Sequence, residues 1–110
     1  MISMAEKISI DDARRIVADV APQQCFWVNN GPIVRNLDEL AKSLEYMKDE
    51  TFWHHVNPDK NDFANWARDV LRDEALAESL KKLKSKEGIA NSIRKRIKTL
   101  ERIVDKVESE

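Results

Sequence analysis

Histidine, carboxylate and amide side chains crowd into residues 54–65 of this chain. His54 and His55 are its only histidines, and Asp62 stands seven residues beyond His55. An imidazole beside a carboxylate can act as a general base, help to bind a metal ion or form a structural hydrogen bond. Adjacent histidines point about 100° apart on a helix, so they rarely share one ion. We therefore favour the structural pair, and we assign no catalytic residue, metal ion or cofactor.

The same segment holds more helix-capping side chains than one helix start can use. Asn57 precedes Pro58 and could cap a helix that begins there, or Asn61 and Asp62 could cap a later start. Asn65 falls inside the next helical stretch, where its amide competes for backbone hydrogen bonds. We hypothesise that the surplus forms a polar cluster that locks two helices together or recognises a partner. Its members are His55, Asn57, Asn61, Asp62 and Asn65.

Apolar residues at helical spacing must position this cluster. A set that recurs at i, i+3, i+4, i+7 and i+8 predicts one buried helix face, made by Phe63, Trp66, Ala67, Val70 and Leu71. Phe52 and Trp53 precede the histidines, and we expect both to pack in the core, with the indole N–H bound to a partner. The polar cluster should then lie beside an aromatic core.

The segment also resembles a small archaeal and bacterial domain family of unknown function. Residues 55–57 match a His-Val-Asn pattern, and residues 60–66 match Lys-Asn-Asp-Phe-Ala-Asn-Trp. Pro58 in the spacer departs from that pattern. With the aromatic stretch and helix that precede it, the resemblance covers Cys25 to Leu83. It implies no activity, but its polar signature is more elaborate than caps require, which favours a recognition surface.

Helical periodicity over the rest of the chain predicts a mainly α fold. Ser9 can cap an N-terminal helix within residues 1–21 that Pro22 stops, while Asn36 and Asp73 can cap two later helices. Short β-prone runs flank an Asn-Gly pair, which predicts one hairpin near residues 25–35. We expect a compact bundle of five to six helices with that hairpin, in a single domain spanning residues 1–110.

A basic amphipathic helix is predicted over residues 86–108. Residues 1–80 carry 9 Lys/Arg and 15 Asp/Glu, a net charge of −6, whereas residues 81–102 carry 9 and 2, a net charge of +7. An apolar seam near the 3.5-residue period could be buried on the domain itself or on a second chain as a homodimer, and consists of Ile89, Ile93, Ile97, Leu100, Val104 and Val107.

The basic face of this helix could meet nucleic-acid phosphates. The residues that project from it are Arg94, Lys95, Lys98 and Arg102. The face lacks aromatic side chains on which bases could stack. We therefore favour a solvated face over a nucleic-acid site.

Composition and motifs bound the remaining function classes. With Cys25 as the one cysteine no internal disulfide can form, so we expect a reducing cytoplasm. Apolar runs are too short to span a membrane, and the N-terminus lacks a signal-peptide pattern. Glycine-rich phosphate loops and nucleophile motifs are absent. We expect a non-catalytic interaction or regulatory module with a protein partner; the alternatives are a nucleic-acid-binding accessory protein and a small-ligand or metal site around His55 and Asp62.

Overall fold

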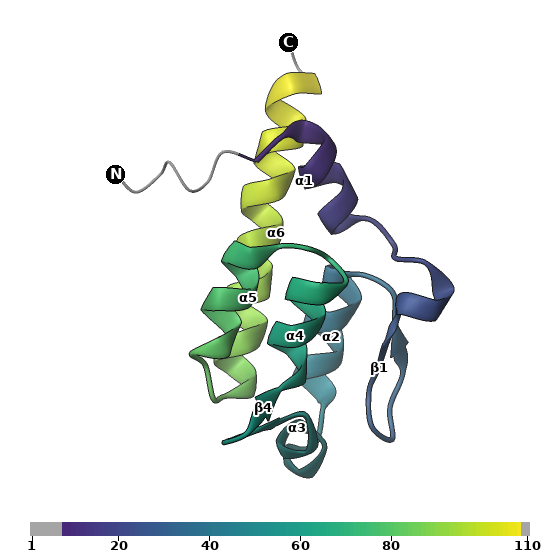
Figure 1. Ribbon diagram of the computed structural model, residues 1–110, viewed down its shortest axis with the longest axis vertical. Coiled ribbons are helices and arrows are strands. Elements are labelled where there is room, and N and C mark those ends of the chain that lie inside the picture. Colours follow the sequence, from purple (N-terminus) through teal and green to yellow (C-terminus); the bar gives the residue numbers. More distant parts are fainter. Residues whose placement is uncertain (1–7, 109–110) are drawn as a thin grey trace.

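The computed structural model describes the backbone of residues 8–108 and the side chains of residues 8–105. Its described part is mainly α, as the periodicity predicts (Figure 1). The helices are α1 (Ile10–Val17), α2 (Leu37–Tyr46), α3 (Asp49–His55), α4 (Asp62–Asp69), α5 (Glu74–Lys81) and α6 (Lys86–Glu108). A 3₁₀ turn, η2 (Pro22–Gln24), precedes the strands β1 (Phe26–Trp27) and β2 (Ile33–Val34). The strands β3 (Val56–Asn57) and β4 (Lys60–Asn61) lie between α3 and α4.

Side-chain caps set the helix starts. The Ser9 hydroxyl accepts the Asp12 N–H at 3.0 Å, and the Asn36 and Asp73 side chains cap α2 and α5 in the same way, as predicted. Of the two predicted starts for α4, the later one is found, because the Asn61 side chain accepts the Ala64 N–H at 3.0 Å. The N-terminal helix is shorter than expected: its last residue is Val17, and four residues separate it from Pro22.

The long helix α6 runs the length of the molecule, and α1, α2 and α5 pack along it (Figure 1). Ile89, Ile93 and Leu100 are fully buried, and Ile97 and Val104 pack against the core at its edge. These residues are therefore covered within the chain, and pairing of the seam with a second chain stays a prediction. Val107 lies outside the residues whose side chains are described.

An aromatic core joins α3, α4 and the first hairpin. The Phe63 ring stacks at 5.1 Å on Phe26 and at 6.1 Å on Phe52. The Trp66 indole N–H donates to the Gln24 carbonyl at 2.8 Å, so α4 is tied to η2. Val70, expected in the core, is only half-buried because α4 ends one residue before it.

Trp53 is the clearest error of the predicted core. Its side chain is 52% exposed and touches Phe52 only edge-on, with ring centroids 5.0 Å apart. The helix α3 spans seven residues and lies at the surface, so it can bury one narrow face. Thr51, Phe52 and His55 occupy that face, and Trp53 is turned away from it.

A second hairpin, which the sequence did not predict, separates α3 from α4. Strands β3 and β4 pair antiparallel, with Val56 opposite Asn61 and Asn57 opposite Lys60. The Asn57 side chain closes the turn, because its Oδ1 accepts the N–H groups of Asp59 at 2.9 Å and Lys60 at 3.1 Å. Asn57 is therefore a turn residue and not a helix cap. None of the helices in the described part of the chain is long and apolar enough to cross a membrane.

Candidate functional site

His55 sits at the end of α3 with both ring nitrogens engaged. The residue is 5% exposed. Its ring centroid lies 5.1 Å from that of Phe26 and 5.4 Å from that of Phe63. Its Nε2 lies 3.0 Å from the backbone nitrogen of Asn29, and its Nδ1 lies 2.9 Å from Asp62 Oδ2. A backbone N–H can only donate, so Nε2 must be an unprotonated acceptor. Nδ1 then carries the proton and donates a hydrogen bond to Asp62, so His55 is a neutral imidazole of fixed tautomer.

Asp62 receives two donors on the same oxygen. Besides the His55 ring, Lys60 Nζ lies 3.0 Å from Asp62 Oδ2. Partial burial raises the pKa of the Asp62 carboxyl, but the hydrogen bonds from His55 and Lys60 outweigh burial and hold this pKa below its ordinary value. Asp62 therefore stays ionised and orients the imidazole.

The hairpin β1–β2 is held by this imidazole. Its turn spans residues 28–31, with the Gly31 N–H donating to the Val28 carbonyl at 3.0 Å. The positive φ of the turn falls on Asn30, at 58°. Gly31 has no room for a side chain, since an added Cβ would lie 2.7 Å from Val28 Cγ1. His55 fixes the same turn by accepting the Asn29 N–H.

Alternation along the hairpin separates a buried face from an exposed one. Phe26 and Val34 face inward and are buried. Trp27 and Ile33 are opposite each other in the register and are 69% and 51% exposed. Tyr46, at the end of α2, is 86% exposed and lines the same open hollow of about 430 Å³ as Ile33. We call Trp27, Ile33 and Tyr46 the hairpin face; sequence reasoning missed it, because two-residue strands carry too little alternation to assign faces.

The structure splits the predicted polar cluster into two parts. His55 and Asp62 bind each other, whereas Asn57, Asn61 and Asn65 make no hydrogen bond to either of them in the described residues. Those three asparagines instead line one hollow of about 280 Å³ beside β3–β4, α4 and α5. We call this hollow the asparagine groove.

A buried ion pair that sequence reasoning missed lies on the other side of α5. Asp73 is 3% exposed, and Arg96 of α6 donates to both of its oxygens at 2.8 and 2.9 Å. A signal for it exists, since Arg96 falls three residues after Ile93 and four before Leu100, within the apolar seam. A charged residue in seam register indicates a buried partner.

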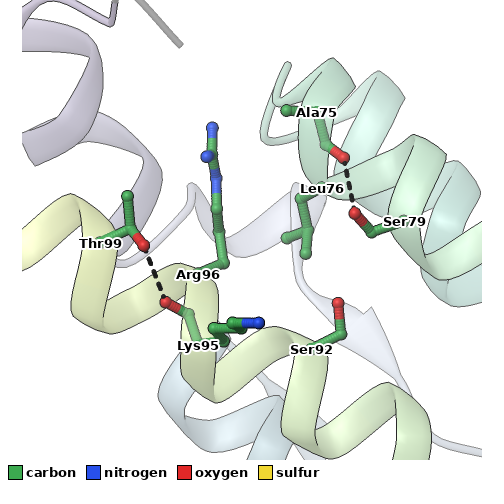
Figure 2. A pocket seen from close by; sticks show the side chains of 7 residues that line it. All are labelled: Ala75, Leu76, Ser79, Ser92, Lys95, Arg96 and Thr99. Carbon is green, nitrogen blue, oxygen red and sulfur yellow. Dashed lines mark hydrogen bonds between the residues drawn. The ribbon is translucent and has the colours of Figure 1, made fainter. Parts of the chain in front are cut away.

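The basic face of α6 is partly neutralised. Arg94 pairs with Glu45 of α2, while Lys95, Lys98 and Arg102 are exposed. Figure 2 shows the hollow of about 270 Å³ between α5 and α6, beside Lys95. Two of its hydroxyls are turned back onto their own helices, because Ser79 donates to the Ala75 carbonyl and Thr99 to the Lys95 carbonyl. These two hydroxyl groups are therefore not available to donate to a ligand.

Comparison with known proteins places the chain in a family. The family model of DUF5752, a family of unknown function, matches residues 23–110. The chain belongs to the DUF5752 family. The match starts at η2, so α1 precedes the DUF5752 region, and it extends past the end of the resemblance noted in the sequence. No curated protein and no solved structure matches the chain.

The DUF5752 assignment brings no chemistry of its own, so function rests on the geometry. Across residues 8–105, no group of three or more His, Cys, Asp or Glu side chains is arranged to hold a metal ion. The prokaryotic origin that the resemblance implies, and its signature, stay predictions.

Proposed function

We propose that this DUF5752 chain is a non-catalytic protein-interaction module whose hairpin face binds a short apolar segment of another protein. The observation that carries the proposal is the exposure of three large apolar side chains: Trp27 and Ile33 pair across the hairpin, and Ile33 and Tyr46 line one hollow. Trp and Tyr dominate binding hot spots, since each offers a large rigid apolar area with a polar tip. Exposed apolar side chains gathered in this way mark interaction surfaces.

The support beneath the hairpin strengthens this proposal. The hairpin has two residues per strand, and an isolated hairpin of that size would not hold its shape in water. Phe26 packs it onto Phe63, and the Asn29 N–H bond to His55 orients its turn. A surface already held in one shape loses less conformational entropy when a partner binds. His55 and Asp62 thus act in recognition as positioning residues.

The size of the hairpin face argues for a short segment as the occupant. Large aromatic side chains present roughly 150–250 Å² each, so this face offers a few hundred Å². Each partner in a stable complex of standard size buries about 800 Å². The face is therefore too small for a symmetric pairing of two copies by itself, but it suits one apolar segment seated in the hollow between β2 and α2.

The geometry gives the enzyme alternative less support. A general base needs a free lone pair directed at a substrate, and the Nε2 lone pair of His55 accepts the Asn29 N–H inside the core. Cys25 has a free thiol, whose one described polar contact is to the Ala21 carbonyl at 3.7 Å. A chain with one cysteine suits a reducing cytoplasm, and that location is part of the proposal.

The nucleic-acid alternative also has less support. The exposed cations Lys95, Lys98 and Arg102 lie along α6, but α6 carries no aromatic residue on which a base could stack. Arg94, the fourth predicted contact, is engaged by Glu45.

Selection of binding peptides tests the proposal. A random peptide library displayed on phage, panned against the intact chain, should yield segments rich in large apolar side chains. Their dissociation constants, measured by fluorescence anisotropy, should rise at least about tenfold in the Trp27→Ser and Tyr46→Ser variants, since removing a hot-spot aromatic costs 2 kcal/mol or more. Trp53→Ser is the matched control, because Trp53 is similarly exposed but lies on α3.

Two results would overturn the proposal. Selected peptides that bind the Trp27 and Tyr46 variants as tightly as the native chain would place the site elsewhere. A native chain that sediments as a dimer, and becomes monomeric in the Trp27→Ser variant, would make a second copy the occupant.

A further inference from the structure

The asparagine groove contains one unpaired cation among the residues that the structure describes. Its basic residues are Lys60, Arg68, Lys81 and Lys84, and its acidic residues are Asp59 and Glu78. Three of these four cations already have an ion-pair partner, since Lys60 binds Asp62, Arg68 binds Asp69 and Lys81 binds Glu78. Lys84 has none among the described residues, and an unpaired lysine beside a hollow attracts anionic ligands.

The same groove contains side-chain amide groups that do not donate to any described residue. The Oδ1 of Asn57 accepts two backbone N–H groups, but no partner of its NH₂ group occurs among the described residues. The side chain of Asn65, half-buried in the middle of α4, makes no hydrogen bond within the part of the chain that the structure describes. Asn61 uses its oxygen to cap α4 and its NH₂ to bind the Leu80 carbonyl at 3.0 Å. Asn61 therefore holds the groove walls together, and the other two can serve a ligand.

The kind of cation present selects the anion. A planar carboxylate is best met by the fork of an arginine. The Arg68 fork is already occupied by the Asp69 carboxylate, with contacts at 2.9 and 3.2 Å. The remaining cations are lysines, which bind phosphate groups as point charges. Lys84 makes no ion pair among the described residues, so its charge is free.

We propose that the asparagine groove binds the phosphate group of a small phosphorylated molecule. Lys84 supplies charge, and the NH₂ groups of Asn57 and Asn65 supply hydrogen bonds. The volume of about 280 Å³ fits a phosphate and a small body attached to it, since pockets for drug-sized ligands start near about 300 Å³. The site is separate from the hairpin face and does not depend on that face binding a partner.

Titration of the ¹⁵N-labelled full chain with inorganic phosphate, followed by NMR at constant ionic strength and pH, tests the proposal. Phosphate should shift amide signals of residues 57–68 and 78–84 in a saturable manner. Lys84→Gln and Asn65→Ala should each raise the dissociation constant about five- to tenfold, as expected for the loss of one charge-assisted contact. Lys84 is exposed and Asn65 is half-buried, so we expect both variants to fold. The amide spectrum of each variant shows whether it does.

Lys95→Gln is the matched control, because Lys95 is an exposed lysine of α6 outside the groove. It should leave the phosphate affinity unchanged. Sodium acetate, titrated in the same way, should bind more weakly. Shifts that never saturate, or that the Lys84 and Asn65 variants leave intact, would overturn the site. Acetate that binds as tightly as phosphate would overturn the assignment of the ligand class.

Discussion

Two aspartates at helix starts, Asp62 and Asp73, each bind a side chain of another helix, but in opposite settings. Asp73 caps α5 and is fully buried against Arg96, which donates to both carboxylate oxygens. Asp62 opens α4, is 30% exposed at its side chain, and accepts a hydrogen bond from the neutral ring of His55 in α3. A buried carboxylate needs a full countercharge and complete hydrogen bonding, whereas a half-exposed one is also stabilised by water.

The two settings leave different amounts of chemistry available. The Asp73–Arg96 pair is enclosed between α5 and α6, and its role is to fix how these helices pack. Because Asp62 needs only one nitrogen of His55, the other nitrogen can hold the hairpin turn. The fully buried Asp73–Arg96 pair thus contributes to stability, whereas the partly buried His55–Asp62 pair positions the hairpin turn.

The largest expected effect breaks the buried side of this comparison. Arg96→Ala leaves the Asp73 carboxylate buried without its partner, so the free energy of unfolding should fall by about 3–5 kcal/mol. Urea denaturation measures this change. Arg94→Ala is the control, because its ion pair with Glu45 is much more exposed and should be worth about 0–1 kcal/mol. Equal losses in the two variants would show that the burial of Asp73 does not matter.

The next effect concerns the half-exposed side. His55→Ala removes the acceptor of the Asn29 N–H and leaves a gap beside Phe26 and Phe63. We expect a loss of about 1–3 kcal/mol. Hydrogen exchange at the Asn29 amide should accelerate more than exchange in α6, because the loss is local.

His54→Ala serves as the control for this change, since the neighbouring imidazole is exposed and has no hydrogen bond among the described residues. Unchanged exchange at Asn29 in the His55→Ala variant would mean that the hairpin turn holds its shape without the imidazole.

The sequence predicted much of the fold because its main signals are local. The caps Ser9, Asn36 and Asp73 and the seam of the last helix follow from spacing alone. The exposure of Trp53 did not, because it depends on where a short helix lies on the surface. For the site, the sequence indicated that His55 and Asp62 could meet, but not that the Asn29 amide would occupy the second nitrogen, since a contact 26 residues away carries no local signal.

The asparagines extend the comparison from charged to neutral side chains. Asn61→Ala removes a cap and a bond to the Leu80 carbonyl and should cost about 1 kcal/mol or somewhat more. Asn65→Ala replaces an unpartnered amide by a better helix former and should leave the free energy of unfolding unchanged or slightly higher. Thermal and urea unfolding separate the two. A clear loss of stability in Asn65→Ala would reveal a bond that the described contacts do not contain.

The smallest effect is the pH dependence of the half-exposed pair. The folded-state pKa of Asp62 lies below its unfolded value, so the folded protein binds fewer protons between the two values. The contribution of Asp62 to stability is then fully present above the unfolded pKa of about 4. It is lost as pH falls through the folded pKa. A ¹³C NMR titration of the side-chain carboxyl should give a midpoint below that of an aspartate in a short peptide. Lys60→Gln removes one of the two donors and should move this midpoint upward, whereas Lys42→Gln, which removes the exposed partner of Asp38, should not. A native midpoint at or above the peptide value would show that burial outweighs both hydrogen bonds. Asp62 and Asp73 would then differ only in how deeply each carboxylate is buried.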